Sequence, residues 1–224
     1  MSAGLPLSGL AMRASSLTTV QQPAIDKALI ALDAVKSALN IIGNANNDFL
    51  NTLRSAASMA ISGYCNRVFQ LETIKDEFWP ARDAYPTQVP GGAVLLQLTR
   101  WPVVTVTSVM ESDTTLADPD DYRQDVERGQ LIRIDGSGYP CRWASLPISV
   151  VYRAGYEIIP ADLQDAALRL VTARWLARGR DPYLRQESIP GVRDVQYWVP
   201  DTPTGALPPD VRELIDGYRV PVIA

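Results

Sequence analysis

The sequence predicts an α+β fold in which a helical bundle carries an inserted antiparallel β-unit. Apolar residues recur at helical spacing before about residue 70, short β-branched and aromatic segments follow between 71 and 153, and a strongly apolar helical pattern returns after Pro160. With 224 residues, 46% of them hydrophobic and 21% charged, the chain can bury one core or one core plus a small appended unit. We expect a flexible N-terminal arm over 1–22, a helical domain from 23–70 plus 160–224, and a β-unit over 71–153.

The first third of the chain predicts an arm and a helical hairpin. Residues 1–22 are rich in Ser, Thr, Gly and Ala, and Arg13 is their only charge, which is typical of a flexible segment. Asp48 is placed to cap a second helix after the break at 43–47. The apolar positions of the first helix are Ile25, Leu29, Leu32, Leu39 and Ile42, and those of the second are Leu50, Leu53, Ala57, Ala60, Ile61, Tyr64 and Val68.

The middle of the chain predicts five or six short strands. Pro and Gly separate these segments, as expected for turns between antiparallel strands. The expected strands are 72–79, 94–98, 103–110, 122–126, 131–134 and 148–152.

The last third predicts an apolar helix, a long connection and a short terminal helix. Pro160 suits the first helical position and Gly179 can end the helix, which is apolar around most of its circumference. Such a helix needs cover on more than one side, from its own domain or from a neighbouring subunit. The connection over 181–206 carries large aromatic residues, which favours a contact surface. A short helix over 208–218 and an apolar tail over 220–224 follow.

The composition argues against most enzyme classes. The chain has no histidine, which removes Ser-His-Asp and Cys-His catalysis, histidine-ligated zinc and the usual near-neutral acid–base group. Cys65 and Cys141 are expected to be free thiols in a reducing compartment, with a disulfide as the alternative. No apolar run approaches the roughly 20 residues of a membrane span, and we expect no signal peptide. We therefore expect no catalytic residues, no metal, no cofactor and no membrane contact.

Two charged groups keep rival functions open. The carboxylates at 118–127 could hold Ca²⁺ or Mg²⁺ in a small metal-dependent enzyme, but their spacing does not fit a calcium loop and Asp-Pro-Asp-Asp favours a solvated turn. The arginines at 169–185 could touch DNA phosphates, but the net charge of −4 argues against a dedicated DNA-binding module. The acidic residues are Asp118, Asp120, Asp121, Asp125 and Glu127, and the basic ones are Arg169, Arg174, Arg178, Arg180 and Arg185.

Several stretches, in their order and spacing, resemble the head–tail connector (adaptor) proteins of tailed bacteriophages. The most specific is the strand and Gly turn at Val150–Tyr156 followed by Ile159–Leu163. The others are Leu32–Ile41, Asp48–Phe69, Leu98–Val109, Ser188–Val192 with Tyr197 and Trp198, and Val211–Tyr218. The resemblance covers about residues 32–220.

This resemblance implies a structural virion protein without enzymatic activity. The chain is expected to form a ring of twelve subunits under the portal, to extend the DNA channel and to offer a platform for the next neck or tail-completion protein. It is expected at the head–tail junction of the virion, after synthesis in the host bacterial cytoplasm. Twelve copies would carry a charge of roughly −48, which would repel phosphates and let the genomic DNA slide without sequence-specific binding.

The resemblance also leads to two sets of candidate contact residues. The alternative within the same class is a stopper or tail-completion protein, which binds the connector rather than the portal. The predicted portal-binding residues are Val211, Leu214, Tyr218, Val220, Val222 and Ile223. The predicted subunit-interface residues are Trp175, Arg174, Arg178, Arg180, Tyr197 and Trp198.

Overall fold

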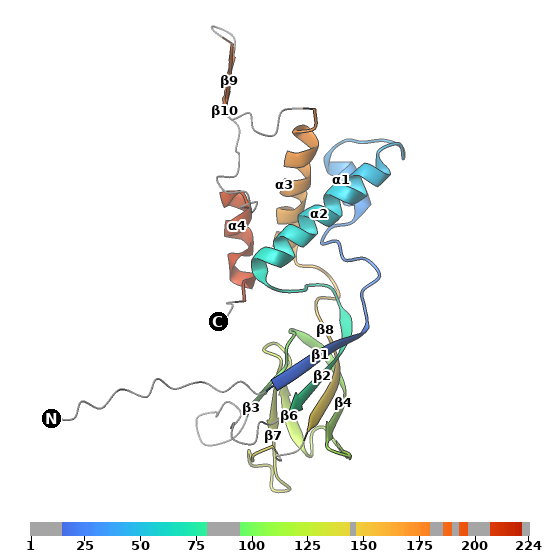
Figure 1. The fold of residues 1–224 in the computed structure, drawn as a ribbon, viewed down its shortest axis with the longest axis vertical. Helices are drawn as coiled ribbons and strands as arrows, with labels where there is room; N and C mark the ends of the chain where they lie inside the picture. The colour runs from blue at the N-terminus through green and yellow to red at the C-terminus, as the bar shows by residue number, and fades with distance from the viewer. Residues whose placement is uncertain are drawn as a thin grey trace, which may run out of the picture. The chain divides into compact units, whose positions relative to one another are not determined.

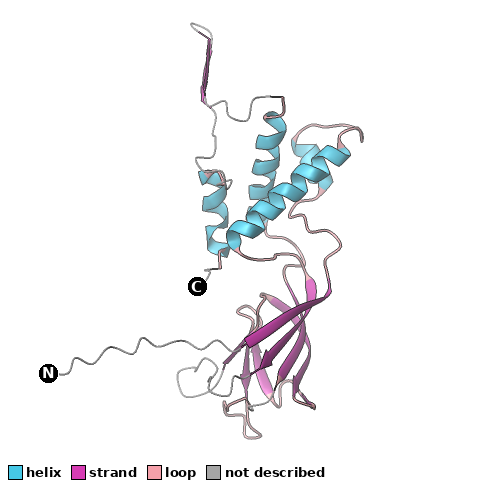
Figure 2. Cartoon of the chain, in the orientation of Figure 1, coloured by secondary structure: helices cyan, strands magenta, loops and turns pink. Residues whose placement is uncertain are grey.

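The computed structural model describes residues 15–79, 95–143, 147–179, 186–189, 193–196 and 207–220. Figure 1 and Figure 2 show most of the strands gathered in one part of the chain and the helices in another. One compact unit joins the described residues up to Pro23 to Leu71–Gly155, and the other joins Ala24–Gln70 to the described residues from Tyr156 onward. The predicted α+β class is confirmed, because the described chain combines four α-helices with antiparallel sheets.

A five-stranded antiparallel sheet dominates the first unit. Its strand order is β1-β2-β8-β4-β5, so β2 and β8 lie inside it and β1 and β5 form its edges. Glu72 pairs with Ala154 at one end of the β2–β8 ladder, and Phe78 pairs with Ile148 at the other. The strands are β1 (Ser15–Gln22), β2 (Glu72–Trp79), β4 (Val103–Glu111), β5 (Thr114–Leu116) and β8 (Ile148–Ala154).

A three-stranded sheet, in the order β3-β7-β6, completes this unit. Its strands are β3 (Leu95–Gln97), β6 (Tyr122–Asp125) and β7 (Gln130–Arg133). Successive side chains of a strand point to opposite faces, and β2 and β8 accordingly bury alternate residues. These form one core with residues of the smaller sheet and of the loops, including Ile74, Phe78, Leu98, Leu131, Trp143, Val150 and Tyr152.

The second unit packs four helices around its own core. They are α1 (Leu32–Ala38), α2 (Asn47–Cys65), α3 (Ala161–Leu176) and α4 (Pro209–Ile215), the last followed by a 3₁₀ turn, Asp216–Tyr218. The core includes Leu50, Ile61, Phe69, Leu163, Leu170 and Ile215. Two short strands, β9 (Gln186–Ile189) and β10 (Arg193–Gln196), pair with each other within the connection between α3 and α4.

Two expectations for the first forty residues were wrong. Residues 15–22, expected within the flexible arm, form β1, because this Thr- and Val-containing stretch pairs with β2. The first helix spans only Leu32–Ala38, and Ile25 and Ile42 are fully exposed. The apolar spacing therefore extended beyond the helical segment, which Asn40 ends by adopting a positive φ of 53°.

Other boundaries differ from the expectation by small amounts. Asn46, rather than Asp48, precedes α2, and Asp48 lies in the first turn, where the helix dipole favours a negative charge. Strand β2 has the expected bounds, 72–79, and the other five expected strands differ by up to two residues at an end. The sequence pattern did not predict β5, β9 and β10, which are only three or four residues long.

A buried carboxylate lies inside the five-stranded sheet. Asp76 of β2 is fully buried and accepts hydrogen bonds from the Tyr152 hydroxyl at 2.7 Å, and from the Thr99 amide and hydroxyl at 2.9 Å. Burial, reinforced by the Asp76 charge, raises the pKa of Tyr152. Four residues earlier on the same face of β2, the buried Glu72 forms an ion pair with Arg100. Burying a charge is unfavourable unless it is paired and hydrogen-bonded, so these contacts hold the loop at 99–100 in place.

We predict that Asp76→Ala lowers the free energy of unfolding of the β-rich unit by about 3 kcal/mol, because it leaves the Tyr152 hydroxyl and the Thr99 amide without their buried acceptor. Urea unfolding followed by circular dichroism measures the change. Asp120→Ala, at an exposed turn, serves as the control and should change stability by less than about 0.5 kcal/mol. Equal stability of the two variants would contradict the assignment.

Candidate functional site

The C-terminal end of α3 carries three of the predicted subunit-interface residues. Trp175 is partly buried against the helical core, and its ring lies 5.9 Å from that of Phe49, centroid to centroid. The guanidinium of Arg178 lies 3.5 Å from the Trp175 ring centroid, which is a cation–π contact. Arg174 is half-buried, and burial lowers the pKa of its guanidinium. Leu176 beside them is 72% exposed.

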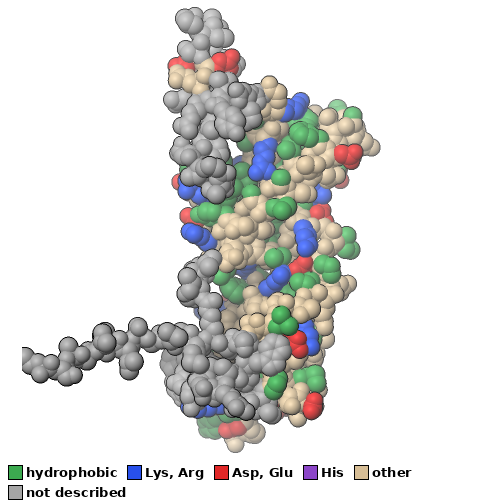
Figure 3. All heavy atoms as spheres, in the orientation of Figure 1, with side chains coloured by type: hydrophobic (Ala, Val, Ile, Leu, Met, Phe, Trp, Pro, Cys, Tyr) green, Lys and Arg blue, Asp and Glu red, His purple; other side chains and the backbone are tan. Residues whose placement is uncertain are grey.

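This end of α3, defined by Arg174, Trp175, Leu176 and Arg178, is called the α3 patch below. Aromatic residues and arginine are enriched in protein–protein interfaces, so its composition suits a contact with another protein. On the face that Figure 3 shows, basic, acidic and hydrophobic side chains of the described residues are interspersed, without a large block of one charge. The other three predicted interface residues, Arg180, Tyr197 and Trp198, lie outside the described residues.

The C-terminal helix uses most of its apolar residues inside its own unit. Val211, predicted to bind the portal, is buried in the helical core together with Ile215, so its side chain offers no docking surface here. Leu214 and Tyr218 are partly buried against the same core. An apolar stripe on a short helix can pack into the core of its own domain or against a partner protein. In this chain it packs into the helical core. Val222 and Ile223 lie outside the described residues.

Tyr218 ties the end of this helix to the rest of the unit. Its hydroxyl donates to the Asp162 carboxylate, at 2.8 Å to one oxygen and 2.9 Å to the other. Its ring meets those of Phe69 and Tyr156 edge to face, with centroids 5.9 and 6.4 Å away. The Arg67 guanidinium lies over the Phe69 and Tyr156 rings. Burial, the hydrogen bond to Asp162 and its negative charge raise the pKa of Tyr218 to about 12.

Two more contacts fix the start of the tail. Tyr64 of α2 donates to the Asp216 carboxylate at 2.5 Å, a bond that raises the pKa of Tyr64. The amide of Val220 donates to the Cys65 carbonyl at 2.9 Å. The last described residues, up to Val220, are therefore held beside the end of α2.

The exposed face of α4 is charged. Asp210, Arg212, Glu213, Asp216 and Arg219 are all exposed, and Arg169 of α3 pairs with both Asp165 at 2.9 Å and Asp210 at 3.2 Å. Asp165 precedes Arg169 by four residues on the same helix, whereas Asp210 is 41 residues away from Arg169 in the sequence. A partner that meets this face would meet mixed charges rather than an apolar surface.

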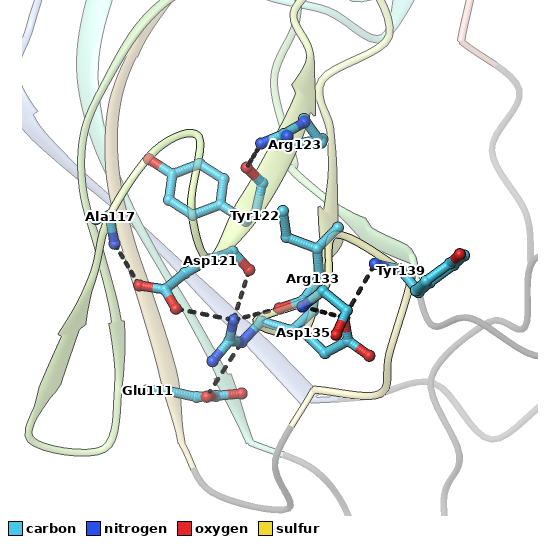
Figure 4. Close-up of polar contacts among 10 residues, drawn as sticks. Glu111, Ala117, Asp121, Tyr122, Arg123, Arg133, Asp135 and Tyr139 are labelled. Carbon is cyan, nitrogen blue, oxygen red and sulfur yellow. Dashed lines mark hydrogen bonds and ion pairs between the residues drawn. The ribbon is translucent and has the colours of Figure 1, made fainter.

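The acidic segment at 118–127 is held together by its own turns and by arginines. The Arg133 guanidinium contacts the Asp121 main-chain oxygen at 2.5 Å and carboxylate at 3.3 Å, and the Glu111 carboxylate at 3.5 Å (Figure 4). Asp118 accepts a bond from Gln124 at 2.8 Å. Bonds from the amide and side chain of Arg128 lower the pKa of Asp125.

The same part of the molecule offers no metal site among the residues that the structure describes. No group of three or more His, Cys, Asp or Glu side chains there could hold an ion.

Both cysteines are free thiols, and burial raises the pKa of Cys65 to about 11, so its thiol stays protonated at neutral pH. Within the described ranges, no helix is long and apolar enough to cross a membrane.

Comparison with known proteins gives a shared fold. No protein-family profile and no curated protein sequence matches the chain. Among solved structures, a chain in the neck of an empty gene transfer agent particle, computed with C6 symmetry, matches with a TM-score of 0.54 and 17% identity. A chain in the virion of the native gene transfer agent particle matches with a TM-score of 0.54 and 19% identity. Each match covers 93% of this chain and 97% of the other.

The fold is therefore one found in the neck of a phage-like particle. The likeness spans both units, since it extends over 93% of the chain.

We predict that Tyr218→Phe lowers the free energy of unfolding by about 1 kcal/mol, because it removes the hydrogen bond to the Asp162 carboxylate at a partly exposed site. The wild-type chain should lose stability as the pH rises from about 10 to about 12. Over this range the unfolded tyrosine ionises while the folded Tyr218 keeps its proton. Tyr218→Phe should flatten part of this fall, and thermal melts at pH 7 to 11 measure it. The control Tyr139→Phe, at an exposed position, should match the wild type at pH 7; equal melting curves for Tyr218→Phe and the wild type at every pH would contradict the prediction.

Proposed function

We propose that the chain is a structural protein of the neck of a tailed, phage-like particle, specifically a head–tail connector (adaptor) that forms a ring under the portal. The observation that carries this proposal is the shared fold, over 93% of the chain, with a chain from the neck of a gene transfer agent particle. The connector-like stretches of the sequence, above all Val150–Tyr156 with Ile159–Leu163, support it independently. A helical bundle with an inserted β-unit is the architecture proposed for this role, supported by the division of the chain into two units.

A ring is the assembly that this role requires. The related neck was computed with C6 symmetry, which supports cyclic repetition, and a ring of twelve copies is consistent with a six-fold axis. In a ring, each copy meets its two neighbours through two different surfaces. The α3 patch is one such surface, because its Trp175 and Arg178 suit a protein contact.

The electrostatics of the chain fit a channel that DNA passes without being held. The net charge is −4 per copy, so an assembled ring repels phosphates rather than binding them. Two of the five arginines that could have contacted DNA are engaged within the chain: Arg169 pairs with Asp165 and Asp210, and Arg178 lies on Trp175. These contacts favour the structural role over a DNA-binding module.

A metal-dependent enzyme receives less support. The carboxylates that would serve it, Asp118, Asp121 and Asp125, accept bonds from Gln124, Arg133 and Arg128, respectively, and so stabilise turns of the β-rich unit. We propose a non-enzymatic role without a cofactor.

Docking on the portal is proposed for the tail that follows the C-terminal helix. The contacts of Tyr218 and Val220 hold the chain in place up to Val220, and the apolar Val222 and Ile223 follow in the sequence. Leu214, half-buried, and Val220 complete the proposed surface, whereas Val211 does not contribute because it lies in the core. The next neck or tail-completion protein would bind the opposite side of the ring.

We predict that the full chain co-purifies with the portal of its own particle, and that deletion of residues 221–224 weakens this association at least tenfold. The deletion removes apolar contacts while leaving the Tyr218 and Val220 anchors in place. A matched control, Ile158→Ser at an exposed position in the helical unit, should bind as the wild type does. Binding only to a preformed connector ring would instead assign the chain as a stopper or tail-completion protein.

A further inference from the structure

The two outer edges of the five-stranded sheet carry no charged side chain. Strand β1 contains only Ser, Leu, Thr, Val and Gln, and β5 only Thr and Leu. The charges lie inside the sheet instead, with Glu72, Lys75, Asp76 and Glu77 all on β2. Natural sheets usually place charged residues on edge strands to prevent pairing with other chains. The distribution in this sheet is the reverse of that pattern.

Strand β1 also contributes nothing to the core of its own unit. None of its described side chains, at 16–22, is buried, and Leu17 and Val20 are 51% and 38% exposed. It is held by its backbone pairing with β2 and by a 3.1 Å bond from the Thr18 hydroxyl to that of Thr99. Its register shift lies near the end, between Val20 and Gln22, which leaves 15–20 as a regular edge.

The opposite edge of the sheet is open over most of β4. Strand β5 pairs only with Val109–Glu111, and no described strand pairs with residues 103–108 on that side. This stretch, Val-Val-Thr-Val-Thr-Ser, is uncharged as well, and Val104, Thr105 and Thr107 are exposed. Among the described residues, one main-chain group of this stretch bonds outside the sheet, the Val103 amide, which donates to the Val126 carbonyl. The pairing of β4 with β8 shifts register between Val103 and Thr105 and between Val106 and Ser108, so the edge is irregular at these two places.

We propose that these two edges pair with each other between copies, so that β1 of one chain adds to the β4–β5 edge of the next. Main-chain hydrogen bonds would supply the affinity, as in other cases of strand addition, and Leu17 and Val20 would pack across the junction. Because the two edges are different surfaces, the contact is head-to-tail, and each added copy presents a fresh edge. That these head-to-tail copies close into a ring rests on the proposed neck function. The edge-to-edge contact itself does not depend on that function.

Cysteine pairs placed on the two edges test the contact in the full chain. One set of variants carries a cysteine on β1 (Leu17→Cys, Thr19→Cys or Gln21→Cys) and the other carries one on β4 (Thr105→Cys or Thr107→Cys). All are made with Cys141→Ser, which removes the partly exposed thiol, while Cys65 is buried. A disulfide forms only between Cα atoms about 4.4–6.8 Å apart, so it reports neighbouring strands, and the panel covers the unknown register.

We expect at least one mixture of a β1 variant with a β4 variant to form a cross-linked dimer under mild oxidation at high protein concentration. Each variant alone should stay uncross-linked. Met59→Cys, 74% exposed on α2, is the matched control and should not cross-link to either set. Cross-linking of β1 variants with themselves, or the absence of any β1–β4 product across the panel, would overturn the proposal.

Charge substitutions give a second readout. Leu17→Lys with Val20→Lys should leave the melting temperature within a few degrees, because both side chains are exposed, and should weaken self-association at least tenfold by sedimentation. Mixing this variant with Thr105→Glu should restore association. Unchanged association of the lysine variant would also overturn the proposal. Neither result bears on co-purification with the portal, so failure of the edge contact is distinguishable from failure of the neck function.

Discussion

The antiparallel pairing of β2 with β8 is the contact on which the β-rich unit depends. The ladder runs from Glu72 opposite Ala154 to Phe78 opposite Ile148, so its first end lies where the chain re-enters this unit at Leu71 and leaves it after Gly155. The first and last strands of the Leu71–Gly155 segment are therefore neighbours in space, and the helical unit is built from Ala24–Gln70 before this segment and the described residues after it. Every other strand of the sheet adds outward from this pair, β1 beside β2, and β4 with β5 beside β8. The buried Asp76 adds specificity to the pairing register of β2 and β8. The hydroxyl of Tyr152 on β8 can donate to the Asp76 carboxylate only when both side chains lie on the same face of the sheet.

The sequence predicted the elements whose side chains enter a core. Strand β2 alternates buried and partly exposed residues, and α3 buries five of its residues, so both express the periodicity that a sequence reading detects. Strand β1 was not predicted, because none of its described side chains at 16–22 is buried and so no apolar alternation marks it. It forms a strand through its pairing with β2. Ile25 and Ile42 were wrongly assigned to the first helix for the opposite reason. They fit the helical spacing but are exposed and contact no core. The buried state of Asp76 could not be predicted, because its partner Tyr152 is 76 residues away.

For the candidate contact residues too, the sequence pattern could not show which apolar side chains enter the core and which distant residues come into contact. The apolar stripe of α4 fits a core and a docking surface equally well in sequence, and the structure assigns Val211 to the core. Trp175 and Arg178 are three residues apart, at the end of α3 and in the turn after it, so their contact could be anticipated. The aromatic cluster around Tyr218 instead joins Phe69 and Tyr156 from distant stretches. Arg180, Tyr197, Trp198, Val222 and Ile223 lie outside the described residues and stay predictions. The proposed neck role rests on two arguments, the connector-like order of sequence stretches and the fold shared with a neck chain.

Imaging of the assembled particle tests the central claim most directly. Electron cryo-microscopy of necks from particles in which this chain carries a small N-terminal fusion would locate every copy. The account predicts a ring of repeated copies directly below the portal, with fusion density at each copy. Fusion density in the tail or the capsid shell, or below a separate connector ring that itself contacts the portal, would contradict it.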